Sequence, residues 1–390
     1  MTALGYLVPE FPGQTHAFFW REVTALRDGG LRVELLSTRR PAPGSCPHPF
    51  ADQAEAQTAY LFPPGAAALA GLAARPRGLA RALAYAAGVS GAARVAALIP
   101  SAMRLVQHCA ARGIGHVHVH SCANAAHLAA LAQMLGGPDY SVTVHGDLAV
   151  YGADHDRKFA RARLVTAVTE PLAEQIRAVW PGHAVPVIPM GVDVDRFRPA
   201  DGARAEGPAR FVTVARLQAN KGHAHVLRAL ARLRDAGVEA HYTIVGSGPD
   251  AGAIAAGIAA LGLGDRVEMA GTLGQDAVLA LLQQADALVL ASVGLGEAAP
   301  VAVMEAMACG LPVICSRIGG TADMMTDGVE GFLTPQGDEN AITAAVSALA
   351  TDPALRARMG AAARARACAA FDYRVQAGRL RAALADAGAV

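Results

Sequence analysis

The chain has 390 residues, of which 53% are hydrophobic and 17% are charged, and its formal net charge at pH 7 is +1. This length is enough for two domains of ordinary size, and the near-neutral charge argues against a nucleic-acid-binding protein. No uninterrupted apolar run reaches about 18 residues, so we expect no transmembrane helix. The N-terminus lacks a basic region and a cleavage site, which predicts a first strand rather than a signal peptide. Six cysteines form no C-x-x-C pair, which favours free thiols in a reducing cytoplasm.

The chain opens with an expected strand–helix–strand unit. Strand Leu4–Val8 is followed by a loop at 9–16, a helix and a second strand, Arg32–Ser37. The loop follows the carboxyl end of its strand, where ligands bind in open α/β sheets. Gly13 and Gln14 could therefore offer hydrogen-bond donors to a ligand, although a plain connecting loop explains the same residues equally well.

Residues 41–64 are Pro-rich and predict irregular structure, and Ala-rich helices follow at roughly Ala66–Leu72, Leu79–Ala87 and Ala92–Arg112. These helices carry arginines with few acids nearby, namely Arg75, Arg77, Arg81, Arg94 and Arg104. A basic, apolar helical patch can lie on an anionic membrane surface, which would place the protein at the inner face of a membrane. A helical insertion that packs on the sheet with a solvated face explains the same pattern, and we prefer this second interpretation.

Three histidines alternate at His116, His118 and His120, on one face of an expected strand. Zinc is a weak interpretation, because alternate strand residues lie about 6–7 Å apart whereas zinc ligands bind at about 2.0–2.1 Å. We expect one or two of them to face a ligand at the strand's end and the others to be structural. His145 comes directly after the next strand, Tyr140–Val144, which suits substrate contact as well as a structural role.

The polar, turn-rich segment 189–210 predicts a connector between two domains. Strand Phe211–Ala215 then ends at Arg216, and Lys221 follows in a short loop. Among 34 Lys and Arg residues only Lys158 and Lys221 are lysines, and a lysine retained among so many arginines favours a site that needs a compact charge. Arg216 and Lys221 are therefore a candidate clamp for a diphosphate, which we prefer to plain surface charge.

A glycine-rich turn follows strand His241–Val245, but it is not a dinucleotide fingerprint. Gly246 and Gly248 begin a G-x-G pattern, whereas the next glycine is Gly252, one place too late for G-x-G-x-x-G. No ribose-binding acid is obvious downstream. A nicotinamide-dependent oxidoreductase is therefore disfavoured.

The stretch 287–320 predicts a strand, a Gly-rich loop, a short helix that begins near Pro300, and a second strand, Val313–Cys315. The loop opens onto a helix N-terminus, which is a natural anion site. Glu297 lies in the loop, and Glu305 is the only charged residue of the helix. Because a carboxylate on an apolar helix is costly to bury without donors, we expect a ligand with hydroxyl or N–H groups to contact it.

Several of these motifs resemble family 4 retaining glycosyltransferases of the GT-B fold. The segment GEAAPVAVMEAMACGLPVICSRIGG, with seven residues between its two key glutamates, resembles the family signature, and VARLQANKG resembles its phosphate-binding pair. IVGSGPD, PMGVDVDRFRP, HVHVH, TVHGDL and EFPGQTHAFFWREV also resemble family patterns in the same order. The resemblance implies an α/β protein with two Rossmann-like, doubly wound domains that face a cleft. It divides the chain into an acceptor-side domain at 1–190, a linker at 191–210, a nucleotide-sugar-binding domain at 211–370 and a C-terminal helix at 371–390 that packs back on the first domain.

The resemblance also implies roles for the charged residues. Glu305 would accept hydrogen bonds from the ribose hydroxyls of a nucleotide sugar, and Glu297 would bind hydroxyls of the donor sugar. Arg216 and Lys221 would neutralise the departing diphosphate. His145 would approach the sugar from the first domain.

Further residues would complete the implied site. Backbone amides at Ala298, Ala299 and Val301 would assist with phosphate or sugar. Gly13 and Gln14 would line the cleft, and the turn with Thr272 and Leu273 would lie near the base. This chain has Ala298-Ala299 where the family commonly has glycine and an aromatic, and Met190 where it often has asparagine, so the identity of the donor is in doubt.

We therefore expect a retaining, metal-independent hexosyltransferase that moves a sugar from a UDP- or GDP-linked donor to an acceptor hydroxyl of a saccharide or lipid, in polysaccharide, lipopolysaccharide or glycolipid synthesis. No cofactor is expected beyond the donor substrate. A nucleotide-sugar epimerase or a glycosidic phosphorylase of the same fold is the alternative. A nucleotide-sugar-binding module without activity is a third interpretation, which the intact charged residues disfavour.

Overall fold

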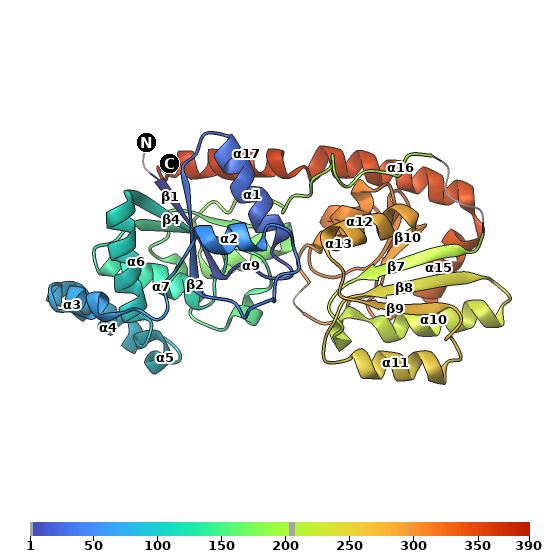
Figure 1. Ribbon diagram of the computed structural model, residues 1–390, viewed down its shortest axis with the longest axis horizontal. Helices are drawn as coiled ribbons and strands as arrows, with labels where there is room; N and C mark the ends of the chain where they lie inside the picture. The colour runs from blue at the N-terminus through green and yellow to red at the C-terminus, as the bar shows by residue number, and fades with distance from the viewer. Residues whose placement is uncertain (1–2, 203–206, 296) are drawn as a thin grey trace. The chain divides into compact units, whose positions relative to one another are not determined.

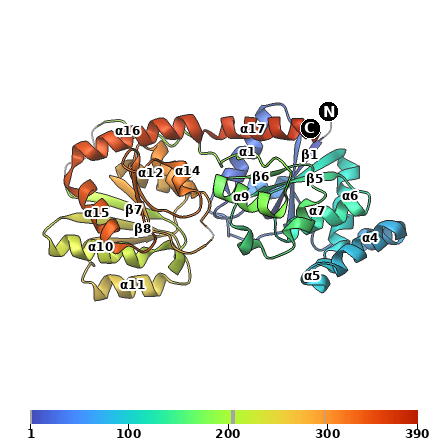
Figure 2. The same cartoon turned by 180° about the vertical axis from the view of Figure 1, so that it is seen from behind.

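The computed structural model describes residues 3–202, 207–295 and 297–390. Its contacts divide the chain into two compact units (Figures 1 and 2). Unit 1 contains Met1–Pro189 and Arg374–Val390, and unit 2 contains Met190–Tyr373. Each unit holds a six-stranded sheet whose neighbouring strands are parallel. The predicted α/β class with two doubly wound domains is thus confirmed.

The sheet of unit 1 has the strand order β3-β2-β1-β4-β5-β6. Its strands are β1 (Ala3–Glu10), β2 (Val33–Arg39), β3 (Thr58–Tyr60), β4 (Ile114–Val119), β5 (Asp139–Val144) and β6 (Val165–Ala167). The chain adds β2 and β3 on one side of β1 and then β4 to β6 on the other, so the order reverses between β1 and β4. In open α/β sheets the loops at the carboxyl ends of the strands beside such a reversal form the binding crevice.

Helices of unit 1 lie on both faces of its sheet, whereas the helices between residues 66 and 96 pack mainly on other helices (Figure 1). The helices of the unit are α1 (Ala17–Asp28), α2 (Ala51–Gln57), α3 (Ala66–Ala73), α4 (Pro76–Ala87), α5 (Ala92–Ala96), α6 (Ile99–Arg112), α7 (Asn124–Met134), α8 (His155–Phe159), α9 (Glu170–Val179) and α17 (Tyr373–Asp386), with a 3₁₀ turn at Leu148–Tyr151. Tyr6 of β1, Phe19 of α1 and Leu380 of α17 share one apolar core. The last helix of the chain therefore packs on the first strand and the first helix.

Three local predictions for unit 1 were wrong. Residues 41–64 are not irregular throughout, because the Pro-free segment within them forms α2 and β3. The expected helix at 92–112 is interrupted at Ala97–Leu98, and Pro100 in the first turn of α6 suits a helix start but not a helix interior. The apolar run Val185–Ile188 predicts a further strand, but the structure forms only an isolated bridge there, between Ala167 and Val187.

The sheet of unit 2 has the strand order β12-β11-β10-β7-β8-β9, so its reversal lies between β7 and β10. Its strands are β7 (Ala209–Val214), β8 (Ala240–Val245), β9 (Val267–Gly271), β10 (Ala287–Leu290), β11 (Val313–Ser316) and β12 (Gly331–Thr334). Its helices are α10 (His223–Asp235), α11 (Ala251–Ala260), α12 (Gln275–Gln284), α13 (Val301–Ala308), α14 (Thr321–Met324), α15 (Glu339–Thr351) and α16 (Pro353–Ala370), with a 3₁₀ turn at Ala219–Lys221. Central strands that are buried on both faces explain the continuous apolar runs in the sequence.

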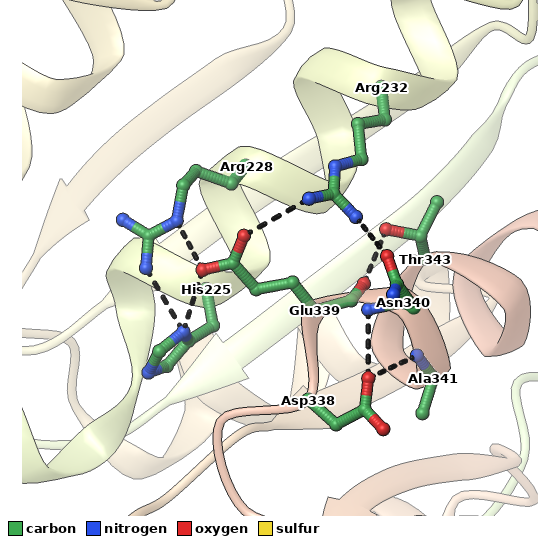
Figure 3. Close-up of polar contacts among 8 residues, drawn as sticks. All are labelled: His225, Arg228, Arg232, Asp338, Glu339, Asn340, Ala341 and Thr343. Atoms are coloured by element: carbon green, nitrogen blue, oxygen red, sulfur yellow. Dashed lines mark hydrogen bonds and ion pairs between the residues drawn. The ribbon is translucent and has the colours of Figure 1, made fainter.

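A polar cluster fixes the N-terminus of α15 against α10 (Figure 3). Glu339 Oε1 accepts hydrogen bonds from Arg228 Nε at 2.5 Å and faces His225 Nδ1 at 3.2 Å, while Arg232 contacts Oε2 at 3.3 Å. Asp338 caps α15 by accepting from two backbone amides at 3.0 Å each. Because α10 starts directly after the loop that carries Lys221, this cluster also holds the helix that follows that loop.

The segment predicted as a linker packs on unit 2 where the structure describes it. The amide of Val192 donates to the carbonyl of Phe371 at 2.7 Å, and the amide of Tyr373 donates to Val192 at 3.1 Å. The guanidinium of Arg364 donates to the carbonyls of Val194 and Phe197 at 2.9 Å each. This segment is therefore held by α16 and the residues that follow it.

Candidate functional site

An ion pair joins the loops that follow β7 and β10, the two strands beside the reversal in unit 2. The ammonium of Lys221 lies 2.5 Å from Oε2 of Glu297, and the hydroxyl of Ser292 donates to the same oxygen at 2.8 Å. The side chains of Lys221 and Glu297 are only 15% and 9% exposed. Withdrawing a charge from water costs on the order of several kcal/mol, so each charge depends on the other for compensation.

Two glycines make this arrangement possible. Gly222 has φ +71°, and a Cβ there would lie 1.8 Å from the carbonyl oxygen of Ala291. Gly319 has φ +53°, and a Cβ there would lie 1.7 Å from the carbonyl oxygen of Glu297. Both positions have a left-handed backbone and a neighbouring carbonyl oxygen where a Cβ would lie. Either feature alone disfavours a side chain. The backbones around Lys221 and Glu297 are therefore fixed by packing.

The glycine-rich turn after β8 supports the loop that carries Arg216. A Cβ on Gly246 would lie 1.9 Å from the carbonyl oxygen of Ala215, and one on Gly248 would lie 2.3 Å from that of Leu217. The amide of Leu217 donates to the carbonyl of Ser247 at 2.9 Å. These glycines thus serve close packing between neighbouring loops, which explains why their spacing departs from a dinucleotide fingerprint.

Two further candidate residues flank the ion pair in the sequence: Arg216 precedes Lys221, and Glu305 follows Glu297. Arg216 is exposed, and within the described part of the chain no acidic side chain forms an ion pair with its guanidinium. Glu305 projects from α13 with a half-buried side chain. Lys221 and Glu297 are thus brought into contact, while Arg216 shares the loop of Lys221 and Glu305 lies on the helix after Glu297.

The remaining predicted residues of unit 2 lie at the ends of neighbouring strands. Ala298 and Ala299 are buried at 5% exposure each, directly before Pro300, and Val301 is the first residue of α13. Thr272 and Leu273 follow β9, and the carbonyl of Gly271, the last residue of that strand, accepts from the amide of Gly246 at 2.8 Å. All five predicted residues therefore lie at the carboxyl ends of strands of the same sheet.

A second polar cluster lies in unit 1, also beside the reversal of its sheet. The hydroxyl of Tyr6 donates to Oε1 of Glu22 at 2.7 Å, and Nε2 of His120 lies 3.4 Å from the same oxygen. Nδ1 of His120 is 3.1 Å from Nε2 of His145. The four side chains come from β1, α1, the end of β4 and the end of β5. His145 is therefore linked through His120 to a carboxylate.

Burial determines the charge of this cluster. It lowers the pKa of His145 to about 3 and that of His120 well below its ordinary value, so both rings are neutral near pH 7. It raises the pKa of Glu22 to about 7, although the hydrogen bond from Tyr6 partly opposes this. At neutral pH the cluster thus contains one group, Glu22, that can gain or lose a proton.

The other two alternating histidines are bound to hydroxyls. His116 Nε2 and His118 Nδ1 lie 2.8 and 2.7 Å from the hydroxyl of Ser141, and His118 Nε2 lies 2.9 Å from that of Thr143. Burial lowers the pKa of His116 to about 4 and that of His118 to about 3. Neutral rings in a ladder of hydroxyls across β4 and β5 are structural.

The loop after β1 holds the remaining predicted residues. A Cβ on Gly13 would lie 2.8 Å from the ring of His16, whose amide donates to the carbonyl of Gly13 at 3.0 Å. The carbonyl of Gln14 accepts from His48 at 2.7 Å, and the Gln14 side chain is half-buried. The loop is thus a tight turn whose backbone is already partly engaged.

Sequence reasoning missed three residues of these clusters, although two left a signal. Glu22 falls on the apolar stripe of α1 with Phe19, Val23 and Leu26, where a carboxylate must find donors. Ser292 is the first hydroxyl after the buried strand β10. Tyr6 left no such signal, because its ring belongs to the core and only its hydroxyl reaches Glu22.

Two family models match the chain in succession. Residues 20–196 match the model described as Glycosyltransferase Family 4, and residues 195–366 match the model described as Glycosyl transferases group 1. The chain is 32% identical over 196 residues to the amylovoran biosynthesis glycosyltransferase AmsK of Erwinia amylovora, with 49% of this chain and 48% of that protein covered. It is 33% identical over 216 residues to the GDP-mannose-dependent alpha-(1-6)-phosphatidylinositol monomannoside mannosyltransferase of Mycolicibacterium smegmatis, with 52% and 56% covered. The chain thus spans about half the length of the curated relatives it matches.

Solved structures show the same fold over nearly the whole chain. The sucrose-phosphate synthase of Thermosynechococcus elongatus aligns with a TM-score of 0.76 at 20% identity, covering 99% of this chain and 100% of that one. Anabaena HepE in complex with UDP-glucose aligns with a TM-score of 0.75 at 18% identity, with the same coverage. At these identities the likeness concerns the fold.

Proposed function

Because the chain belongs to glycosyltransferase family 4, we propose that it transfers a hexose from a UDP- or GDP-linked donor to an acceptor hydroxyl with retention of the anomeric configuration. The observation that carries this proposal is the pair of Lys221 and Glu297 at the strand reversal of unit 2, the position where open α/β sheets bind their ligands. The names of the two curated relatives support a polysaccharide or glycolipid as the product.

The ion pair suits a ligand that has both an anionic and a hydroxyl-bearing part. A diphosphate can replace Glu297 as the partner of Lys221, and sugar hydroxyls can then donate to the carboxylate of Glu297. Arg216 adds a second cation from the same loop, and the amides at Ala298–Val301 add the positive end of α13. Glu305 is assigned to the ribose hydroxyls.

In the proposed reaction the bond between the anomeric carbon and the terminal phosphate oxygen breaks, and its electron pair stays on that oxygen. The acceptor oxygen forms the new bond to the anomeric carbon on the same face, and its proton passes to the leaving phosphate oxygen. Lys221 and Arg216 stabilise the charge that develops on the diphosphate. They would thereby supply the positive charge that a divalent cation could otherwise provide, so chelation with EDTA should leave the rate unchanged.

Lys221→Ala and Glu305→Gln test the assignment. Each should lower transfer by at least about a hundredfold, because electrostatic contacts made to the departing group carry several kcal/mol of the barrier. Arg358→Ala, an exposed cation on α16 of the same unit, is the matched control and should be active. Transfer that is unchanged in Lys221→Ala, with circular dichroism confirming the fold, would contradict the proposal.

The donor is tested by binding. UDP, GDP, ADP and their sugars are each added to the purified chain, and the melting temperature is measured, since a ligand that binds only the native state raises it by mass action. We expect a shift with UDP or GDP that is lost in Lys221→Ala. A shift with none of the nucleotides would contradict the assigned diphosphate site.

Product analysis distinguishes the alternative enzymes of the same fold. A transferase consumes the donor only when an acceptor is present, whereas an epimerase changes the sugar without one. A phosphorylase instead requires inorganic phosphate and a glycoside. The names of the matched relatives favour transfer.

We also propose peripheral contact between unit 1 and an anionic membrane through α3, α4 and α5, which lie together at one end of that unit (Figures 1 and 2). Between Glu55 and Asp139 the sequence has six arginines and no acidic residue, and four of the arginines, Arg75, Arg77, Arg81 and Arg94, lie on or next to α4 and α5. Arg75 and Arg81 donate to the carbonyls of Leu135 and Met134, whereas Arg77 and Arg94 are exposed. Leu69 of α3 and Leu83 of α4 are 58% and 48% exposed. Cations beside exposed apolar side chains suit an anionic lipid surface. Within the described ranges, no helix has both the length and the hydropathy to span a bilayer.

Vesicle flotation tests this contact. The chain should float with vesicles that contain phosphatidylglycerol, should not float with phosphatidylcholine alone, and should be released by high salt. The quadruple variant Leu69→Ser/Leu83→Ser/Arg77→Ala/Arg94→Ala should lose binding. Val375→Ser, which changes a similarly exposed apolar side chain on α17, is the control. Equal binding by the control and the quadruple variant would contradict the proposal.

A further inference from the structure

The cluster of Tyr6, Glu22, His120 and His145 contains a chain of close contacts that runs from a carboxylate to a ring nitrogen. Glu22 Oε1 is 3.4 Å from His120 Nε2, which is an ion-pair contact rather than a hydrogen bond, and His120 Nδ1 is 3.1 Å from His145 Nε2. Nε2 of His120 and Nδ1 of His145 are both buried, and neither has a hydrogen-bond partner among the described residues. The chain of contacts therefore ends at a ring nitrogen of His145 to which no described residue is hydrogen-bonded.

Both histidines are neutral near pH 7, so each carries one ring proton and one lone pair. Which nitrogen carries the proton in His145 follows from His120, because the two rings share one hydrogen bond. The proton position in His120 follows in turn from what faces its other nitrogen, which is Glu22. The tautomers of the two rings are thus coupled.

An ionised Glu22 selects one arrangement. Its carboxylate only accepts, so Nε2 of His120 carries the proton and faces it. Nδ1 of His120 then accepts from Nε2–H of His145, and Nδ1 of His145 is left with a lone pair. In this state His145 offers an acceptor to a ligand hydroxyl.

When Glu22 is protonated, its carboxyl group can donate a hydrogen bond, so Nε2 of His120 no longer needs to carry a proton. Nδ1–H of His120 can then donate to Nε2 of His145, whose Nδ1 now carries the proton. His145 would offer a donor instead of an acceptor. The charge of Glu22 therefore decides the hydrogen-bonding character of His145 without changing the charge of either ring.

We propose that Glu22 is a positioning residue that sets the tautomer of His145 through His120, so that His145 accepts a hydrogen bond from a substrate hydroxyl when Glu22 is ionised. This inference rests on the proposed function for the substrate, and the coupling of the tautomers stands on the geometry of unit 1. Burial supports it, because the raised pKa of Glu22, about 7, puts the change of state within the physiological range.

Among the described residues, two titratable groups contact Glu22, namely Tyr6 on β1 and His120 after β4. Further groups lie one contact away: the rings of His118 and His145 contact His120, and the ring of His16 contacts Phe19. Arg21 precedes Glu22 on α1. Burial keeps the pKa values of His118, His120 and His145 far below neutrality, and that of Tyr6 well above 10. These four groups therefore keep one charge state between pH 6 and 8, while Glu22 changes its own.

Nitrogen NMR of histidine-labelled protein tests the coupling directly, because the shifts of Nδ1 and Nε2 report which atom carries the proton. His145→Gln identifies the signals of His145. We expect the wild-type signals to pass from the Nδ1–H to the Nε2–H tautomer with a midpoint near pH 7. Glu22→Gln should abolish the midpoint, and Tyr6→Phe should move it to higher pH, because the hydrogen bond that favours the carboxylate is lost. Glu174→Gln, an exposed glutamate on α9, is the matched control.

The rate of sugar transfer gives the second readout. Glu22→Gln should lose about tenfold in kcat/KM at pH 8, the worth of one substrate hydrogen bond, and little at pH 6, where Glu22 of the wild type is itself neutral. A loss that is equal at both pH values would overturn the pH-dependent role. A histidine tautomer that does not change between pH 6 and 8 would overturn the coupling.

The two proposals fail in different ways. If the tautomers switch but no sugar is transferred, the proposed function fails and the coupling stands. If sugar is transferred and Glu22→Gln leaves the tautomers of His120 and His145 as in the wild type, the coupling fails and the proposed function stands.

Discussion

Breaking the contact between Lys221 and Glu297 should reveal how strongly these two charges stabilise each other and the folded unit 2. At a usual separation of about 2.8 Å for such a charged pair and an effective dielectric constant of about 20, the attraction amounts to about 6 kcal/mol. The desolvation of the two largely buried ions offsets most of it, which leaves a net coupling of about 1–3 kcal/mol. Lys221→Met alone should cost more than this, about 3–5 kcal/mol, because it leaves the Glu297 carboxylate with the Ser292 hydroxyl as its recorded partner.

A double-mutant cycle measures this coupling. The free energy of unfolding is compared among the wild type, Lys221→Met, Glu297→Gln and the double variant by urea denaturation. The probe should be far-UV circular dichroism, because both tryptophans, Trp20 and Trp180, lie in unit 1 and would not report on unit 2.

The matched control is an exposed ion pair of the same unit. Arg198 and Asp201 form a bidentate contact at 2.9 and 3.1 Å, with side chains that are 52% and 83% exposed. Its coupling should be far smaller, since water screens it. If the cycle for Lys221 and Glu297 gives no more coupling than this control, the pair is effectively solvated and the argument from burial is refuted.

Three further predictions concern stability. Glu22→Gln should gain roughly 2–3 kcal/mol over the wild type between pH 5 and 8, measured by tryptophan fluorescence, because the folded pKa of about 7 lies above the ordinary 4.5 and the wild type loses stability as the pH rises through 7. Gly222→Ala should cost several kcal/mol more than Gly237→Ala in urea denaturation, because both have positive φ but only Gly222 faces a carbonyl at 1.8 Å from its added Cβ. Glu339→Gln should lower the stability above pH 5 by less than about 1 kcal/mol and have no effect at pH 3, because hydrogen bonds from Arg228 and His225 lower the pKa of this partly exposed carboxylate, and its contribution is lost as the pH falls.

Much of the fold could be predicted from the sequence because the strands of parallel sheets are continuous apolar runs. The strands β1, β7, β8, β10 and β11 were each predicted within a few residues. The short edge strand β3 was missed, because three residues, Thr58–Tyr60, give no periodicity and lie among prolines. The break between α5 and α6 was missed because alanine continues the helical pattern across it.

The two charged residues of the candidate site in unit 2 could be predicted from the sequence, but Ser292 and the contacts among the three could not. Lys221 and Glu297 were both identified, yet each was given a ligand rather than the other as its partner. Their contact depends on β7 and β10 being neighbours in the sheet, although 76 residues separate the pair. Strand order is a property of the tertiary structure, so no local pattern could have revealed it.

The scarcity of lysine in the sequence singled out two residues, Lys158 and Lys221, but could not say which of them contacts a ligand. Both lysines of the chain are largely buried, but Lys158 donates to the carbonyl of Tyr151 at 3.1 Å, and its own carbonyl accepts from Tyr140 at 2.7 Å. The ammonium of Lys158 therefore has a backbone partner within unit 1 and no acidic ion-pair partner among the described residues. Lys221 instead faces a carboxylate at the strand reversal, where a diphosphate can replace it. Only their places in the two units distinguish Lys221, which we propose to bind the diphosphate, from Lys158.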